Sequence, residues 1–310
     1  MHRCPAPYRW FALIMLLSPV AVHAGSRAAA PGHDRGVWFW QSPKSPFGSV
    51  AIVGDAKRED ETIANLKKLG ITTVYGSYVS SSDQDALRRW NAKLAANRIS
   101  SYLLLSETEY VYPERWAAAS NILLTNFVQF NHASRPSERF AGVAFDIEPH
   151  ILPASPGHAS WKSADGAERR LDLAGLLTFL QKTRALMDAN GEKNARMEST
   201  LTTWFYKLNE NIQWRDSADR DGWFTQLSQV CDRVSIMDFE IASISGILDR
   251  VQEEGVLLHG KARIALRANA GKEWQSSAAF WIAVHTVESQ TGQSIDIQDY
   301  ALLMTNQGIQ

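Results

Sequence analysis

Two carboxylates at alternate positions end an apolar segment near the middle of the chain. The segment is Ala-Gly-Val-Ala-Phe-Asp-Ile-Glu-Pro, residues 141–149. In a β-strand alternate side chains share a face, so Asp146 and Glu148 are expected to point into the same space and the apolar side chains between them away from it. Two neighbouring, partly desolvated carboxylates repel each other, so one keeps its proton near neutral pH. A protonated carboxyl beside an anionic one is the pair that glycoside hydrolysis requires.

A second acidic segment repeats this arrangement at residues 235–240, Ser-Ile-Met-Asp-Phe-Glu. Asp238 and Glu240 share a face, which we predict to be the same interior face. We therefore predict Asp146, Glu148, Asp238 and Glu240 as the catalytic group. The alternatives are an ion pair with Arg267 for the first two, and a helix cap or a solvated loop for Glu240.

Aromatic and polar side chains at other expected strand ends are candidates for contacting a substrate. Tryptophan rings stack on the apolar face of a sugar, although core packing is an equal alternative for each of them. Tyrosine hydroxyls, a guanidinium or an amide would hydrogen-bond sugar hydroxyls. The candidates are Trp40, Tyr75, Tyr78, Trp204, Tyr206, Arg267 and Asn269. Glu198, by contrast, comes early in its strand and is expected to be a buried structural partner.

Short apolar segments alternate with longer segments of helical periodicity. The expected strands are Gly36–Trp40, Thr72–Tyr78, Ser100–Ser106, Phe140–Glu148, Arg196–Trp204, Arg233–Glu240, Ala262–Ala268 and Tyr300–Met304. The expected helices are Asp60–Leu69, Asp85–Asn97, Pro113–Phe130, Leu173–Ala189, Gly222–Cys231, Ser243–Glu254 and Ser276–Glu288.

Eight strands alternating with helices predict a single (β/α)₈ TIM barrel over residues 36–310. An open doubly wound sheet also alternates and is the second possibility. Little sequence follows the last expected strand, so the last outer helix is expected to be missing. The long connection over residues 150–170 follows the fourth strand, at the end of the barrel where active sites lie, and could wall a cleft.

The first 24 residues have the features of a secretory signal peptide. Arg3 and Arg9 precede or flank a short apolar run, and Val-His-Ala at residues 22–24 is typical of a cleavage site. The run is too short for a spanning helix, although an uncleaved anchor is the rival interpretation. We therefore expect export to the periplasm or beyond, without stable membrane insertion after cleavage, and a loose segment over residues 25–35. Cys4 would leave with the signal, so Cys231 remains alone and is expected to be buried.

Composition excludes several other classes of function. The 310 residues are 45% hydrophobic and carry 32 basic and 33 acidic side chains, for a net charge of −1. This balance gives no electrostatic case for binding nucleic acid or an anionic membrane. No His/Cys cluster has zinc spacing and no glycine-rich phosphate loop is present, so we expect no cofactor and no metal. The 11 Trp fit a carbohydrate partner.

The two acidic segments together resemble the motifs of glycoside hydrolase family 18, the chitinase-like barrels. Residues 141–148 match the signature D-G-x-D-x-D-x-E at its glycine, last Asp and Glu, with Ala141 and Ala144 in the places of the first two Asp. The Met-x-Phe-Glu sequence at 237–240 is similar to the family's M-x-Y-D on strand six. The resemblance implies that Glu148 is the acid, that Asp146 orients an N-acetyl group that acts as nucleophile, and that Glu240 takes the place of the strand-six Asp. The expected eighth strand lacks the family's Trp.

Three hypotheses follow from these residues. The first is an exported glycoside hydrolase that cleaves a polysaccharide or oligosaccharide. The second is a non-catalytic carbohydrate-binding barrel of the cell envelope or of polysaccharide export, which the two alanines favour. The third is a metal-dependent hydrolase with Asp146, Glu148 and Asp238 as oxygen ligands for magnesium or calcium.

Overall fold

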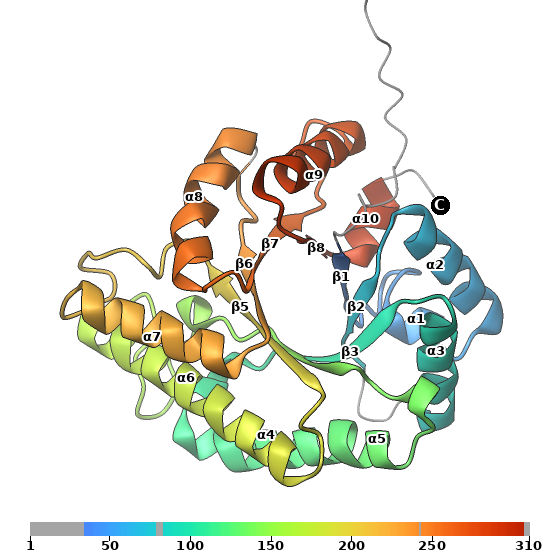
Figure 1. The fold of residues 1–310 in the computed structure, drawn as a ribbon, viewed down its shortest axis with the longest axis horizontal. Helices are drawn as coiled ribbons and strands as arrows, with labels where there is room; N and C mark the ends of the chain where they lie inside the picture. The colour runs from blue at the N-terminus through green and yellow to red at the C-terminus, as the bar shows by residue number, and fades with distance from the viewer. Residues whose placement is uncertain (1–33, 79–82, 242, 307–310) are drawn as a thin grey trace, which may run out of the picture.

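The computed structural model describes residues 34–78, 83–241 and 243–306. Eight parallel strands pair in chain order and β8 pairs with β1, so the sheet closes into a barrel with the helices outside it (Figure 1). The predicted (β/α)₈ barrel is therefore confirmed. The strands are β1 (Arg35–Phe39), β2 (Thr73–Gly76), β3 (Ser100–Leu105), β4 (Gly142–Phe145), β5 (Arg196–Thr202), β6 (Arg233–Met237), β7 (Ala262–Arg267) and β8 (Ile295–Gln298).

Helices follow each strand and begin where short polar side chains cap them. Asp55 accepts from two backbone N–H groups at the start of α2, and Asp165 and Glu168 cap α6 reciprocally. The α-helices are α1 (Ser49–Ile52), α2 (Ala56–Lys68), α3 (Gln84–Ala96), α4 (Trp116–Leu123), α5 (Phe130–His132), α6 (Gly166–Ala189), α7 (Ser217–Val230), α8 (Ile244–Leu257), α9 (Ser277–Thr291) and α10 (Tyr300–Asn306). Short single-turn helices are η1 (Thr108–Val111), η2 (Pro113–Arg115), η4 (Pro136–Glu138) and η5 (Pro149–Ile151), and η3 (Leu124–Gln129) is a π-helical turn.

The end of the chain differs from the prediction. Residues 300–304, expected as the eighth strand, form α10, and β8 lies just before it. The apolar segment at 301–304 fits a helix as well as a strand, and Asp299 accepts from the backbone N–H of Leu302 at 2.8 Å, which favours the helix. Tyr300 packs edge-on against Phe39 of β1, with ring centres 5.6 Å apart. A short outer helix therefore follows the last strand, and the expectation of a missing one was wrong.

The start of the barrel also differs slightly from the prediction. β1 begins at Arg35, whose guanidinium is fully buried and pairs with Glu288 of α9 at 2.7 Å, so this residue belongs to the barrel and not to a loose leader. The predicted signal peptide, residues 1–24, and residues 25–33 lie outside the described residues. Within the residues that the structure describes, no helix is both long and apolar enough to span a bilayer.

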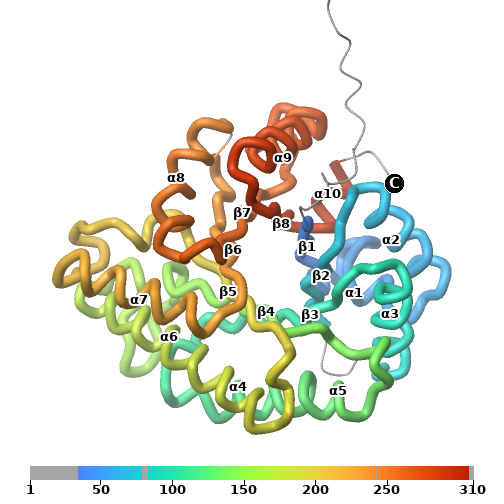
Figure 2. The backbone as a smooth tube through the Cα atoms, in the orientation of Figure 1, coloured from blue at the N-terminus to red at the C-terminus, as the bar shows by residue number. Residues whose placement is uncertain are grey.

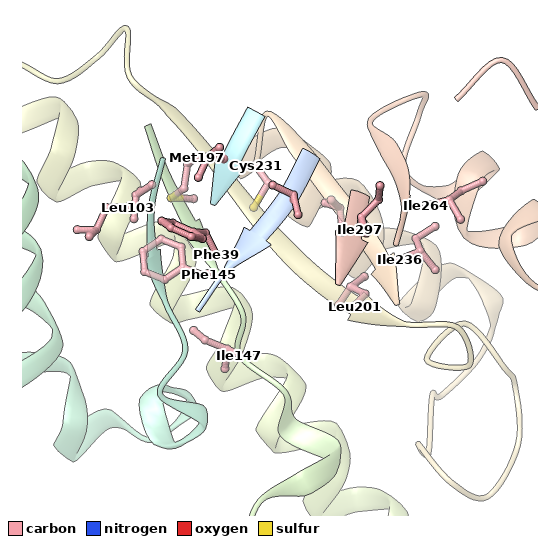
Figure 3. Packing of buried hydrophobic residues seen from close by; sticks show 14 of the residues in the cluster. Phe39, Leu103, Phe145, Ile147, Met197, Leu201, Cys231, Ile236, Ile264 and Ile297 are labelled. Atoms are coloured by element: carbon pink, nitrogen blue, oxygen red, sulfur yellow. The ribbon is translucent and has the colours of Figure 1, made fainter. Parts of the chain in front are cut away.

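Outward-facing side chains of the strands form the main core with the helices. Phe39, Phe145, Ile236 and Ile297 come from four different strands, and each is at most 2% exposed (Figure 3). Cys231, which precedes β6, is 1% exposed and free, as the sequence predicts. These strands carry apolar residues on their outer face because the helices cover it completely.

Charged side chains fill one end of the barrel interior. Arg263 of β7 donates to Asp296 of β8 from Nε at 2.8 Å and from Nη2 at 2.6 Å, and also binds Asp34. Arg233 of β6 donates to Asp34 at 2.6 Å. Gly36 leaves the room for this network, because a Cβ there would lie 2.1 Å from an Asp296 oxygen. This end of the interior is therefore packed and cross-linked.

Aromatic and aliphatic side chains fill the middle of the interior. Trp38, Tyr75, Tyr102 and Leu104 form one buried cluster with residues of β4, β6 and β7. Because this layer is closed, polar side chains that come later on each strand lie above a solid floor, at the carboxyl ends of the strands.

Candidate active site

Asp146 lies at the top of the barrel interior, as the alternation of β4 predicts. Ala144 belongs to the interior cluster, whereas Phe145 and Ile147 belong to the outer core. The Asp146 side chain is 5% exposed and accepts a hydrogen bond from Thr200 Oγ1 of β5 at 2.9 Å. The hydroxyl holds the carboxyl against the neighbouring strand and fixes where it points.

Glu148 follows Asp146 immediately beyond the strand, with its side chain 24% exposed. Burial, and then the negative charge of Asp146, raise the pKa of Glu148 to about 7. Burial also raises the pKa of Asp146 to about 6, against the hydrogen bond from Thr200. The predicted alternative of an ion pair with Arg267 is not found, because Arg267 faces Glu273 at 3.9 Å. The pair therefore holds a proton near neutral pH and stays open to the solvent at Glu148.

His150 contacts Glu148, with Nε2 lying 3.3 Å from Oε2. Burial lowers the pKa of His150, and the charge of Glu240 opposes that shift. Its Nδ1 is buried without a hydrogen-bond partner. His150 was not singled out from the sequence, and it lies in the single-turn helix η5, where the alternation of a strand no longer places side chains. A neutral imidazole can exchange a proton with the Glu148 carboxyl.

Trp204 lies beside this group and is partly exposed. It follows β5 and packs edge-on against His150, with ring centres 6.1 Å apart at 83°. Trp161, from the long β4–α6 connection, packs against Trp204 at 6.0 Å. The connection therefore contacts Trp204, which itself lies beside His150.

The second acidic segment is arranged differently from the prediction. Met237 and Phe239, not Asp238 and Glu240, face the barrel interior, and Phe239 packs edge-on against Trp38 at 6.4 Å. The prediction was wrong because both faces of β6 carry apolar and polar residues, so alternation alone does not show which face points into the barrel. Burial of the larger side chains decided which face points inward. Glu240 is exposed at the strand end, and its charge reaches His150.

Asp238 lies behind β6, under helix α8, and is 2% exposed. Neither of its carboxyl oxygens has a hydrogen-bond partner, and burial raises its pKa to about 7 against the charge of Arg250. Glu254 of α8 is fully buried and equally without partners, and burial, together with the charge of Asp238, raises its pKa to about 9. Asp238 therefore belongs to a buried carboxyl pair outside the site.

Glu254 is expected to make the stability of the protein pH-dependent. Its pKa is higher in the folded than in the unfolded chain, so the proton stabilises the fold below about pH 4.5, and this stabilisation is lost as the pH rises toward 9. Glu254→Gln should flatten the fall in unfolding free energy between pH 5 and 9 by several kcal/mol, because each unit of pKa shift is worth about 1.4 kcal/mol. Urea unfolding at several pH values measures it. Asp249→Asn, at an exposed position of the same helix, should keep the wild-type slope. An equal slope for Glu254→Gln would refute the assignment.

Two of the predicted substrate contacts are enclosed in the structure. Tyr75 is 2% exposed in the barrel interior and donates to Glu198 at 2.7 Å, so Glu198 is the buried structural partner we expected. Tyr78 lies outside the barrel, where its hydroxyl accepts from Trp90 of α3 at 3.0 Å. Tyr75 lies within β2, whereas Tyr78 lies two residues beyond the end of that strand. Neither lies among the residues around Glu148, so we do not retain them as substrate contacts.

The remaining candidates lie around the carboxyl ends of the strands. Trp40 is half-buried on top of the interior cluster. Arg267 ends β7 on the interior face, with its Nε buried and unpartnered. The Asn269 carbonyl accepts the backbone N–H of Glu273 at 3.2 Å and of Trp274 at 3.3 Å, closing the turn after β7. Tyr206 is half-buried toward α8, where burial and then the charge of Glu254 raise its pKa.

The three carboxylates of the metal hypothesis do not come together in the structure. It requires Asp238 to meet Asp146 and Glu148, and Asp238 lies on the other face of its strand. In the described ranges, no group of three or more His, Cys, Asp and Glu side chains is arranged to hold an ion.

Comparison with known proteins gives the fold alone. No protein-family model and no curated protein matches the chain. A candidate α-L-fucosidase from Bacteroides thetaiotaomicron is similar in structure, with TM-score 0.52 and 11% identity over 95% of this chain and 91% of that one. An endo-β-N-acetylglucosaminidase from Cordyceps militaris has TM-score 0.50 and 9% identity over 92% and 98%. A class V chitinase from Nicotiana tobaccum has TM-score 0.42 and 10% identity, and this chain, over 76% of its length, covers 66% of that protein.

Proposed function

We propose that this protein is a glycoside hydrolase in which Glu148 is the general acid. The observation that carries the proposal is the position of Glu148, which follows β4 at its carboxyl end, is partly open to solvent, and lies next to His150 and two residues from the buried carboxyl of Asp146. Burial and the charge of Asp146 raise the pKa of Glu148 to about 7 in this place. A carboxyl that is protonated at neutral pH and partly open to solvent can deliver a proton to a glycosidic oxygen. Trp204 supports a sugar substrate, because its partly exposed ring lies beside His150.

Each side chain around Glu148 has a role in the proposed reaction. Glu148 protonates the leaving oxygen and becomes a carboxylate beside Asp146, and the proton that the attacking water releases balances the one that Glu148 gave up. His150 relays the replacement proton from solvent to Glu148. Glu240, exposed near His150, is the candidate for stabilising the positive charge at the sugar or for activating water. The resemblance to family 18 offers a second route, in which Asp146 orients a substrate acetamido group.

Activity should fall as the pH rises through about 7, because Glu148 then loses the proton that it donates. Asp146→Asn removes the neighbouring charge and should move this alkaline limb to lower pH. A pH profile of kcat/KM for both chains measures it. An alkaline limb that stays in place in Asp146→Asn would contradict the pairing of the two carboxyls.

Hydrolysis of polysaccharides is the experiment that tests the function. The chain without residues 1–24 is incubated with polymers of N-acetylglucosamine and with polymers lacking the acetamido group, and release of reducing ends is followed. Glycosidases among proteins of similar fold motivate this choice. Preference for acetamido polymers supports the substrate-assisted route, and equal cleavage overturns it. Binding of a polymer without any product would overturn the hydrolase and favour a carbohydrate-binding barrel.

Export is part of the proposal. It rests on the signal-like residues 1–24. Fractionation of cells that express the full chain should recover a protein that begins near residue 25 outside the cytoplasm. A full-length protein in the cytoplasm would contradict export.

A further inference from the structure

A guanidinium lies at the carboxyl end of the barrel, across from the acidic pair. Arg267 ends β7 on the interior face, because Arg263 and Ala265, four and two residues earlier, also point inward. β7 lies three strands from β4 in the closed sheet, and the two strands are on opposite sides of the barrel (Figure 2). The positive charge of Arg267 therefore faces the side on which Asp146 and Glu148 lie.

The guanidinium of Arg267 makes no hydrogen bond to any of the residues that the structure describes. It faces Glu273, whose Oε1 lies 3.9 Å from Nη1, beyond hydrogen-bond distance, and Lys272 Nζ lies 3.7 Å from the same oxygen. Gln298, its partner in the register of β7 and β8, leaves its own Oε1 without a hydrogen bond. Polar groups in such partly buried places are normally hydrogen-bonded, so this guanidinium is available to a ligand.

The terminal nitrogens of Arg267 are the donors that a ligand can reach. The side chain is 34% exposed, and Nε is its buried nitrogen. Nη1 and Nη2 therefore form the accessible edge of the guanidinium. The N–H groups of this planar edge match two oxygens of a carboxylate or of a sulfate, and such charge-assisted bonds are about twice as strong as neutral ones.

Aromatic rings on either side of β7 can support a sugar ring. Phe239 follows the neighbouring strand β6, Trp40 follows β1 beyond β8, and both are partly exposed on top of the interior cluster. The apolar face of a sugar stacks on such rings. An anionic group on that sugar would be attracted to Arg267 and repelled by Asp146 and Glu148, so the charges would fix the direction in which the sugar binds.

We infer that the carboxyl end of the barrel binds a polysaccharide of acidic sugars and that Arg267 selects them. The Nη groups of Arg267 donate to the anionic group, a carboxylate or an ester sulfate, and the ring lies over Trp40 and Phe239. The inference rests on the proposed carbohydrate site. It does not depend on Glu148 as the acid, because binding an anionic group needs no proton transfer.

Matched pairs of oligosaccharides test the inference by calorimetric titration. Oligomers of galacturonate, glucuronate and mannuronate are each compared with their methyl esters, and sulfated galactose oligomers with their desulfated forms. The chain without residues 1–24 is used as wild type and as Glu148→Gln, in which hydrolysis does not consume the ligand. An acid form should bind at least about 10-fold more tightly than its neutral partner. The pair that shows this preference identifies the anionic group.

Arg267→Gln should reduce the preference for the acid form to about 2-fold or less, because it removes the charged donors. Arg267→Lys should keep part of the preference, since lysine retains the charge but not the planar fork. Lys272→Gln is the matched control, because Lys272 is a cation in the turn after β7 and is 68% exposed. It should keep the wild-type preference. Circular dichroism of each variant confirms that it folds.

Three results would overturn the inference. They are acid forms that bind no more tightly than their neutral partners, an unchanged preference in Arg267→Gln, and an equal loss of preference in Lys272→Gln, which would show a general effect of charge. Cleavage of neutral polymers without any preference for acid forms would remove the inference and leave the hydrolase. Preferential binding of acid forms without product in the hydrolysis assay would remove the hydrolase and support the inference.

Discussion

Replacing Glu148 with Gln is expected to lower turnover by about 10²–10⁴-fold. The amide keeps the size of the side chain and its place beside His150, which lies 3.3 Å from Glu148, but it has no acidic proton to transfer. KM should change little, because the loss arises in the chemical step and not in binding. Initial rates on the best polymer found by the hydrolysis assay measure the effect.

Glu107→Gln is the matched control for this variant. Glu107 is an exposed carboxylate that follows β3 at the same end of the barrel. The same isosteric change there should leave kcat and KM within about 2-fold of the wild type, as expected of a surface substitution. A Glu148→Gln chain that also keeps wild-type turnover would remove the acid assignment.

Replacing Asp296 with Ala is expected to lower the free energy of unfolding by about 3–5 kcal/mol. Asp296 is fully buried and accepts two hydrogen bonds from Arg263, which is itself 2% exposed, and one from Ser235 at 2.5 Å. Removing the carboxylate leaves the Arg263 guanidinium in the barrel with Asp34 as its remaining acidic partner. The charge cannot be neutralised by losing a proton, because the arginine pKa is too high.

Urea unfolding with the double variant Arg263→Met/Asp296→Ala separates pairing from packing. Removing both charges should recover part of the stability that the single change loses, because no uncompensated charge is left buried. Asp85→Ala, whose ion pair with Arg88 is exposed, should leave the unfolding midpoint nearly unchanged. An Asp296→Ala variant as stable as the wild type would show that the charged network inside the barrel does not stabilise the fold.

The two acidic strand ends show how far alternation in the sequence predicts a site. On β4 one face has only small residues followed by acids, and the other has Val143, Phe145 and Ile147, so the orientation of Asp146 followed directly. On β6 each face mixes polar and apolar residues, and the order was settled by contacts with Trp38 that come from another strand. The space for side chains inside a closed barrel is shared by several strands. The sequence of one strand therefore does not predict which of its side chains fit there.

Other differences also arise from partners distant in sequence. β8 is four residues long and carries the buried Asp296, whose charge is tolerated only because Arg263 lies opposite. The sequence alone therefore favoured the more apolar segment that follows. His150 lies beyond Pro149 in η5, where strand alternation no longer applies, so only the structure shows that its ring contacts Glu148.

The most direct test of the central claim is the pKa of Glu148 itself. Carboxyl carbons labelled with ¹³C are titrated by NMR in the wild type, in Asp146→Asn and in Glu148→Gln, which assigns the signal. We expect Glu148 to titrate near pH 7 in the wild type and at lower pH in Asp146→Asn, because burial and the charge of Asp146 raise its pKa. A Glu148 that titrates near its ordinary value in both chains would contradict the claim that it holds a proton for catalysis.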